Sequence, residues 1–318
     1  MRDSFDPELF RQCWFLTGPT AGGKSEVGIR LAARIDAEIA SLDSMAVYRG
    51  LDIGTAKPTS QQQAQVPHHL IDLVEPDASF SIAQYAEAAA EVVRSVTARG
   101  RRVLFVGGTP LYLKALLRGM FEGPPANWPL RRELELEAAN SAPGHLHARL
   151  ANVDPDAAAR LHPNDTRRLV RALEVFQETG RPISHWQRQF EQPVSREDCR
   201  VAVLDWPRDE LTSRIDRRVD AMFEAGLVNE VQQLQDSGAR LGRTAAQAVG
   251  YREVLAHLAG ELELENCIEQ VKFHTHQFAR RQCTWFRSLS ECRPLELTGS
   301  VHPDTVAEAL ESLLGERN

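Results

Sequence analysis

The sequence predicts an α/β protein with a parallel sheet core, an inserted all-helical domain and a helical C-terminal part. Apolar runs alternate with helical patterns over the first hundred or so residues, which is typical of a parallel sheet with helices on both faces. Helical patterns alone then occupy the segment up to residue 199. A glycine-rich turn, Gly18–Ser25, joins the first apolar run to the first helical pattern. Ligands of such sheets bind beyond the carboxyl ends of the strands, so that edge is where a site is expected.

Apolar runs that stop at a glycine or an acidic residue predict the strands of the sheet. They are Gln12–Thr17, Glu38–Leu42, Arg102–Val106 and Cys199–Leu204. Apolar residues at helical spacing predict helices over Ser25–Ile35 and Phe80–Thr97, the second ending in a basic turn and Gly100.

The alternation breaks at a segment rich in proline and glycine, Phe121–Pro129. Helical patterns follow one another after it, at Leu130–Ala142, Gly144–Val153, Asp156–Leu161 and Thr166–Glu178. We therefore predict a core formed by residues 1–122 and 200–318 and a helical insertion domain formed by residues 123–199. After Pro207 the pattern is helical again to about residue 287.

The composition is that of an ordinary globular protein, 318 residues long, 42% hydrophobic and 25% charged, which excludes a disordered or fibrous chain. No apolar stretch is long enough for a membrane span, and the first residues lack the pattern of a signal peptide. The 5 cysteines are scattered and form no CxxC pair, so a disulfide framework or thiolate zinc site is not expected. We expect a cytoplasmic protein that needs no more than a monomer.

The net charge of −7 does not exclude a nucleic-acid partner, because binding depends on where the positive charges lie. Residues 290–318 are acidic, and the rest of the chain is nearly balanced. Two basic strips stand out, residues 160–188 and 272–287, and the second contains no acidic residue. The composition permits a polyanionic partner without requiring one.

The strongest local signal is the sequence Gly18, Pro19, Thr20, Ala21, Gly22, Gly23, Lys24 and Ser25, which matches GxxxxGK[ST] between a strand and a helix. Such a loop turns its backbone N–H groups toward phosphate oxygens, as in nucleotide-binding and ATP-binding proteins. Lys24 would neutralise a terminal phosphate, and the Ser25 hydroxyl would bind Mg²⁺. The sequence therefore predicts a P-loop NTPase-like core that binds a diphosphate or a triphosphate.

Two further polar residues follow predicted strands and should face the same edge. Asp43 follows the second strand, and Thr109 follows the third. From the residues alone Asp43 is a metal ligand, a general base or a turn cap, and the cap is the commonest of these.

Eight segments that occur in order extend the pattern beyond the P-loop. They are Gly18–Ser25, Asp43–Arg49, Asp52–Pro58, Gly107–Tyr112, His162–Asp165, Arg171–Val175, Gly250–Tyr251 and Arg281–Arg287. The set resembles the tRNA dimethylallyltransferases, the bacterial tRNA isopentenyltransferase family, from about residue 13 to 287. Gly22 and Ser25 differ from the commonest family residues but keep the chemistry of the loop.

The resemblance implies transfer of a dimethylallyl group from dimethylallyl diphosphate, with Mg²⁺, to N6 of adenosine 37, beside the tRNA anticodon. Asp43 would then be the general base and Lys24 the group that stabilises the diphosphate. Thr109 would bind either the amine or the diphosphate, and Arg218 would bind the diphosphate. The resemblance also implies contacts to the tRNA anticodon stem-loop from Asp43, Ser44, Met45, Ala46, Thr109, Arg131, Arg167, Arg168, Leu169, Val170, Arg171, Gln247, Gly250, Tyr251, Arg280, Arg281, Gln282, Thr284 and Arg287.

Helical spacing assigns faces to the two basic strips. In Thr166–Glu178 the arginines fall off the apolar stripe, on the exposed side. In the second strip Gln277, Arg280, Thr284 and Arg287 share one face, whereas Ile268, Val271, Phe278 and Trp285 are expected to face the core. Exposed guanidinium groups suit RNA phosphates and splayed bases, although a basic face is more often only solvated.

Other function classes explain less of the sequence. A P-loop kinase of small molecules would not need the basic strips. A prenyltransferase that acts on free AMP would not need the insertion, and a non-catalytic RNA-binding module would not need Lys24, Ser25, Asp43 and Thr109 together. The pairs His68–His69 and His274–His276 have no third ligand at a spacing that supports zinc.

Overall fold

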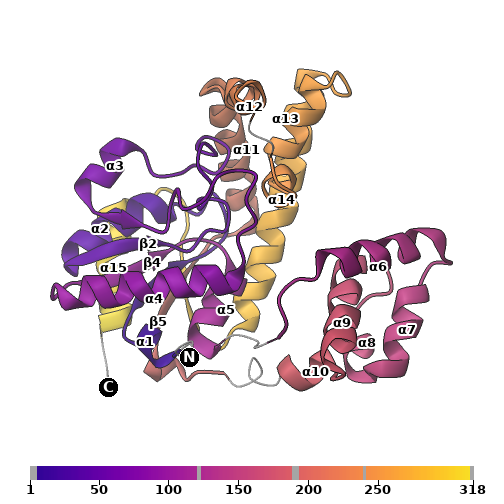
Figure 1. The fold of residues 1–318 in the computed structure, drawn as a ribbon. Coiled ribbons are helices and arrows are strands. Elements are labelled where there is room, and N and C mark those ends of the chain that lie inside the picture. The colour runs from indigo at the N-terminus through magenta and orange to yellow at the C-terminus, as the bar shows by residue number, and fades with distance from the viewer. Residues whose placement is uncertain (1–5, 120–122, 188–192, 239–240, 316–318) are drawn as a thin grey trace. The chain divides into compact units, whose positions relative to one another are not determined.

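A computed structural model describes residues 6–119, 123–187, 193–238 and 241–315 of the chain. The chain divides into two compact units, one formed by residues 1–117 and 193–318 and the other by residues 118–192 (Figure 1). The second unit begins and ends a few residues before the predicted insertion, 123–199. In the described residues no helix is both long enough and apolar enough to cross a membrane.

The first unit is built on a six-stranded parallel sheet in the order β3-β2-β4-β1-β5-β6. Its strands are β1 (Trp14–Thr17), β2 (Ala37–Ser41), β3 (His68–His69), β4 (Arg102–Val106), β5 (Arg200–Asp205) and β6 (Cys292–Glu296). The predicted α/β class is confirmed, and the predicted strands are β1, β2, β4 and β5. The sequence did not predict β3, which has only two residues, or β6, an edge strand interrupted by Pro294.

Helices cover the sheet and extend beyond it (Figure 1). Those of the first unit are α1 (Glu8–Arg11), α2 (Lys24–Arg34), α3 (Ser60–Gln65), α4 (Ile82–Ala98), α5 (Pro110–Arg118), α11 (Arg208–Glu224), α12 (Leu227–Asp236), α13 (Tyr251–Leu258), α14 (Leu264–Ser288) and α15 (Pro303–Gly315). Short 3₁₀ turns occur at η2 (Arg196–Asp198) and η3 (Ala245–Gln247).

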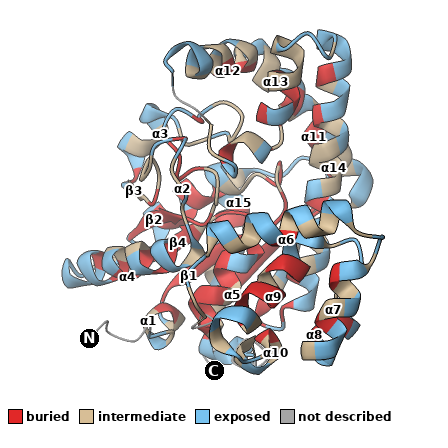
Figure 2. Ribbon diagram, turned by 45° about the vertical axis from the view of Figure 1, so that its right-hand side comes forward, coloured by how far each residue is buried: buried red, intermediate tan, exposed pale blue. Residues whose placement is uncertain are grey.

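The core lies against both faces of the sheet, whose central strands are buried in Figure 2. Phe15 of β1 stacks on Phe105 of β4 with ring centroids 4.9 Å apart. On the other face α2 packs closely because Gly28 faces Val106, where an added Cβ would lie 2.9 Å from the valine Cγ2. This contact holds the start of α2, and the P-loop before it, near the carboxyl ends of the strands.

The acidic C-terminal segment belongs to the core. Its helix α15 packs on α2 with Ala307 and Leu310 fully buried. At the edge of this contact Arg34 pairs with Glu311 at 2.7 Å. The acidic residues therefore offset arginines of α2, although such exposed pairs contribute little stability.

The long helix α14 exposes one aromatic residue that helical spacing placed in the core. Phe278 is 39% exposed, which makes that prediction wrong. The buried face carries Val271, Ala279, Gln282 and Phe286. The sequence misled here because a polar residue, Gln282, occupies the inward position.

The second unit is a helical bundle. It contains α6 (Trp128–Asn140), α7 (His145–Val153), α8 (Pro155–Arg160), α9 (Thr166–Thr179) and α10 (Ile183–Trp186). Leu134, Leu150, Leu169 and Leu173 form the centre of its hydrophobic cluster. The break predicted at Phe121–Pro129 lies partly outside the described residues.

We predict that Gly107→Ala destabilises the first unit. A Cβ at Gly107 would lie 2.3 Å from the backbone carbonyl of Leu42, which joins β2 to the site loop and has little freedom to move. Overpacking of this kind costs about 1–3 kcal/mol, measurable as a lower urea midpoint. Gly315→Ala is the control, because no atom of the described residues lies within 4 Å of its added Cβ. Equal midpoints for the two variants would contradict the prediction.

Candidate active site

Three loops meet at the carboxyl edge of the sheet. The P-loop follows β1, Asp43 follows β2, and the segment Gly107–Thr109 follows β4. Backbone hydrogen bonds tie the last two loops together, since the Thr109 N–H donates to the Leu42 carbonyl at 3.1 Å. Since β2, β4 and β1 are adjacent in the sheet, residues distant in sequence lie around one site.

The P-loop is held by its carbonyl groups. Trp206 donates its indole N–H to the Gly22 carbonyl, and Arg214 donates to the Ala21 carbonyl, both at 3.0 Å. The Arg214 guanidinium also lies over the Trp206 ring, 4.1 Å from the centroid. Gly23 has the left-handed φ of 86° that the turn into α2 requires. With the carbonyls engaged, the first N–H groups of α2, which have no intrahelical partner, remain for an anion.

Two cations lie beside this loop. Lys24 donates to the Pro19 carbonyl at 2.6 Å, and burial together with the nearby Arg218 lowers its pKa to about 7. Burial also lowers the pKa of Arg218, against the opposing effect of Asp43. Among the described residues no ion pair neutralises either group. Two partly buried positive charges at a helix N-terminus form a site for a doubly or more highly charged anion.

Asp43 and Thr109 occupy the acceptor side of the site. One carboxylate oxygen of Asp43 accepts the Met45 N–H at 2.8 Å, so the turn-cap reading from the sequence is part of its role. In the described residues its other oxygen accepts no hydrogen bond. The Thr109 hydroxyl oxygen accepts the Ser44 N–H at 3.1 Å, which leaves its hydrogen free to donate. The pair thus offers one proton acceptor and one donor next to the cations.

The residues present suit a magnesium ion shared with a phosphate ligand better than an all-protein metal site. Within the described residues no group of three or more His, Cys, Asp or Glu side chains could hold a metal. Ser25 is exposed at the start of α2. Mg²⁺ commonly takes one or two protein ligands and completes its shell with phosphate oxygens and water, so Ser25 fits that arrangement.

The loop after Asp43 is held by two charged side chains, Glu230 and Lys57. Glu230 accepts the N–H groups of Asp52 and Ile53, and the hydroxyl of Tyr251 at 2.6 Å. Lys57 is 4% exposed and binds Asp52 and Asp72. Tyr251, a predicted RNA contact, is fully buried in this structure, where its hydroxyl helps to hold Glu230.

The remaining predicted RNA contacts of the first unit divide between the surface and the interior. Arg280, Arg281, Thr284 and Arg287 are exposed on α14, as is Gln247 on η3. Arg287 lies 3.3 Å from Asp205. Ser44 and Met45 are half-buried at the site, whereas Ala46, Gly250 and Gln282 are buried and have no side-chain surface for an RNA in this structure.

The arginines of the second unit also divide into two kinds. Arg167 and Arg168 are exposed on α9. Arg131 and Arg171 instead bind Glu174, which is fully buried and holds their guanidinium groups in place. Burial is the largest single influence on the pKa of Glu174 and raises it, but the hydrogen bonds from Arg131, Arg171 and the Asn127 N–H together outweigh burial and lower the pKa. Leu169 and Val170 are buried in the bundle, so their side chains pack rather than face a partner.

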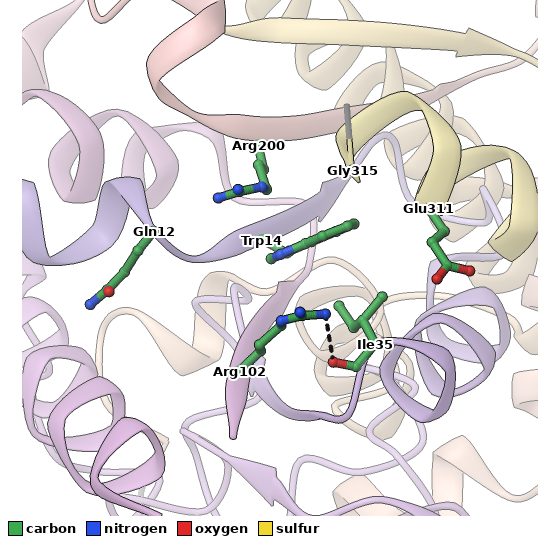
Figure 3. Close-up of a pocket in the computed structure, with 7 residues that line it drawn as sticks. All are labelled: Gln12, Trp14, Ile35, Arg102, Arg200, Glu311 and Gly315. Atoms are coloured by element: carbon green, nitrogen blue, oxygen red, sulfur yellow. Dashed lines mark hydrogen bonds between the residues drawn. The ribbon is translucent and has the colours of Figure 1, made fainter. Parts of the chain in front are cut away.

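A pocket of about 430 Å³ opens at the opposite edge of the sheet (Figure 3). It is lined by Trp14, Arg102 and Arg200, the first residues of β1, β4 and β5. Ligands of parallel sheets bind at the carboxyl ends of strands, and this pocket lies at the amino ends. It therefore has no part in the site described above.

Sequence reasoning missed the residues that hold the P-loop. Trp206, which follows β5, carries no sequence signal of this role, yet it donates to the loop. Arg214 could have been found from its spacing, because it lies one helical turn before Arg218 and shares that face of α11.

Comparison with known proteins identifies the family. The IPP transferase family pattern matches residues 46–289. The chain belongs to this family. A tRNA dimethylallyltransferase of Rhodopirellula baltica is 46% identical over 96% of this chain and 94% of its own length. A tRNA dimethylallyltransferase 1 of Trichlorobacter lovleyi is 50% identical over 86% of this chain and 90% of its own length.

Solved structures agree with this assignment. A tRNA isopentenylpyrophosphate transferase of Bacillus halodurans superimposes with a TM-score of 0.69 at 37% identity, over 96% of both chains. A eukaryotic dimethylallyltransferase acting on tRNA gives a TM-score of 0.71 at 28% identity, over 89% of this chain and 73% of that one. The family predicted from the ordered motifs, and the prediction that the chain is a prenyltransferase enzyme, are confirmed.

We predict that binding of inorganic pyrophosphate above pH 7 takes up a proton. The pKa of Lys24 is about 7 in the free protein, and a bound anion raises it by stabilising the ammonium. Affinity should therefore fall as the pH rises from 7 to 9, by up to about tenfold per unit. Calorimetry at pH 8 in buffers of different ionisation enthalpy measures the uptake.

The control is Lys24→Arg, since a guanidinium keeps its charge over this range. It should abolish the uptake and flatten the dependence on pH. Equal proton uptake by both proteins would show that another group titrates.

Proposed function

We propose that this enzyme transfers a dimethylallyl group from dimethylallyl diphosphate to N6 of adenosine 37, 3′-adjacent to the anticodon of a tRNA. The observation that carries the proposal is the meeting of an anion site, formed by the P-loop, Lys24 and Arg218, with a carboxylate and a hydroxyl, Asp43 and Thr109. A tRNA substrate also implies a reaction in the cytoplasm.

The anion side serves the leaving group. As the bond between C1 of the prenyl group and the diphosphate oxygen breaks, negative charge grows on the diphosphate. Lys24, Arg218 and the amides at the start of α2 already lie where that charge develops, so they stabilise the transition state without reorganising. Ser25 would bind a Mg²⁺ shared with the diphosphate, which supplies further neutralisation of that charge.

The acceptor side serves the nucleophile. The exocyclic amine of adenine is weak because its lone pair is delocalised into the ring. As N6 bonds to C1 of the prenyl group, it becomes positively charged and must lose a proton. The free oxygen of Asp43 accepts that proton, and the Thr109 hydroxyl orients the amine or the diphosphate.

The arginines exposed on α14 and α9 suit the tRNA. Arg280 and Arg281 extend from the helix that also reaches the P-loop, and Arg167 and Arg168 lie on the second unit. Phosphate contacts position an RNA, whereas the target adenine has to leave its stack to meet the prenyl donor. Arg131 and Arg171 support α9 through Glu174 rather than binding RNA alone.

The deciding experiment supplies labelled dimethylallyl diphosphate and unmodified tRNA, with and without Mg²⁺. Label is expected in the RNA only when Mg²⁺ is present. Label in free AMP but not in RNA would favour the smaller acceptor, and phosphate transfer from ATP would favour a kinase. Either result would overturn the proposal.

We predict that Asp43→Asn lowers kcat by roughly 10²–10⁴-fold, the usual contribution of a general base. The amide oxygen still caps the Met45 N–H, so the turn is retained. Affinity for the donor should stay equal or increase, because the lost negative charge faces Lys24 and Arg218. Single-turnover rates and pyrophosphate binding measure the two effects. A rise in KM for tRNA with kcat unchanged would exclude the base role.

We predict that changing both Arg167 and Arg168 to Gln flattens the dependence of tRNA affinity on salt. Each lost phosphate contact reduces the log–log slope by about 0.7–0.9, so the pair should reduce it by about 1.5. The matched control changes Arg30 and Arg94, which lie on α2 and α4, outside the proposed RNA surfaces. If both pairs give the wild-type slope, the arginines of α9 are only a solvated face.

A further inference from the structure

Gln282 is a polar residue buried on the inner face of α14. It is 4% exposed, whereas Arg280, Arg281 and Thr284 around it are exposed. Burial of an amide costs stability unless both of its ends are hydrogen-bonded. Hydrogen-bond partners, rather than apolar packing, therefore explain why the Gln282 side chain faces inward.

Both ends of this amide bind backbone groups of loops at the site. The side-chain carbonyl accepts the Thr20 N–H of the P-loop at 2.9 Å. The side-chain NH₂ donates to the Gly108 carbonyl of the loop after β4 at 2.5 Å. An added Cβ at Gly108 would lie 2.5 Å from that nitrogen, so the glycine leaves room for the contact.

The two loops lie on different sides of the site, one on the anion side and the other on the acceptor side. Thr20 precedes Lys24 on the loop that surrounds the anion site. Gly108 precedes Thr109, whose hydroxyl oxygen accepts the Ser44 N–H beside Asp43. A single side chain thus spans from the anion side to the acceptor side, and it lies on neither of those loops.

We propose that Gln282 is a positioning residue that sets the spacing between the diphosphate side and the acceptor side of the active site and links both to α14. A misplacement of about 1 Å between reacting groups costs about 10²-fold in rate. The residue acts through the Thr20 and Gly108 backbones and does not itself touch the reacting atoms. The part of the inference that concerns catalysis rests on the proposed prenyl transfer.

The link to α14 has a further consequence. The exposed face of this helix carries Arg280 and Arg281, the proposed RNA contacts, and the buried face carries Gln282. A helix moves as a unit, so an RNA that shifts α14 also shifts the groups bound to Gln282. Affinity for pyrophosphate should therefore change when tRNA is bound, and the tRNA affinity must change by the same factor.

The glutamine amide provides one acceptor and one donor at this place, at any pH. Methionine has a similar length but bonds neither loop. An ionised glutamate accepts the Thr20 N–H but repels the Gly108 carbonyl, whereas a protonated glutamate accepts from one and donates to the other. The variants Gln282→Met and Gln282→Glu therefore separate hydrogen bonding from side-chain volume.

The test measures kcat, KM for each substrate, pyrophosphate affinity and melting temperature. Gln282→Met is expected to lower kcat about 10²-fold, with KM for tRNA changed less than about threefold. The kcat of Gln282→Glu, relative to wild type at the same pH, should be low at pH 9 and should approach the wild-type value at pH 6. In both variants the effect of tRNA on pyrophosphate affinity should be lost.

Two controls exclude a purely structural effect. Gln232→Met changes a half-buried glutamine of α12 that, among the described residues, hydrogen-bonds only Asp236, and should leave kinetics unchanged. Val93→Ala opens a cavity in the core beneath α4 and should lower the melting temperature without loss of kcat. If Gln282→Met lowers kcat no more than Val93→Ala does, the proposal is wrong. It is also wrong if the kcat of Gln282→Glu, divided by that of wild type, stays the same from pH 6 to pH 9.

The pyrophosphate arm separates this inference from the proposed function. If wild type transfers no prenyl group to tRNA, the proposed function fails, but weaker pyrophosphate binding by Gln282→Met still supports the link from Gln282 to the P-loop. If wild type is active and Gln282→Met matches it in kcat and pyrophosphate affinity, the positioning role fails alone.

Discussion

The candidate active site depends on two positive charges, Lys24 and Arg218, that the fold partly buries without an ion pair for either in the described chain. Taking a cation out of water is costly, and the lowered pKa of Lys24 is the visible consequence. The surrounding structure tolerates this cost because the sheet, α2 and α11 are already fixed by apolar burial. A bound polyanion would offset this cost, so the arrangement that destabilises the empty site also favours an anionic ligand.

Glu174 in the second unit is, by contrast, a buried charge that is fully paired. Its carboxylate is fully buried, but Arg131 and Arg171 bind it and the Asn127 N–H donates to it at 2.7 Å. A charge satisfied in this way holds α6 and α9 together and needs no ligand. The contrast explains why arginines of similar appearance in the sequence divide into structural residues and residues that remain open to a partner.

The P-loop illustrates how supports decide the chemistry of a motif. Its glycines permit the turn, but Trp206, Arg214 and Gln282 hold it there from three separate parts of the chain. Two of these partners bind carbonyl groups and so turn amides toward the anion. The motif alone indicates that the loop can bind phosphate. The three contacts fix the position of the loop relative to the rest of the site, including Asp43.

The sequence by itself determined the family, the P-loop, the four main strands and the helical insertion, because each is encoded by neighbouring residues at regular spacing. It also placed Asp43 and Thr109 at one edge, since strand ends meet there in a parallel sheet. Tertiary structure alone decided that Phe278 is exposed, that Arg171 binds Glu174 and that Gln282 faces inward. The inward or outward direction of a helix position depends on what packs against it, and the two partners of Gln282, Thr20 and Gly108, are 262 and 174 residues away in the chain. No local pattern carries that information.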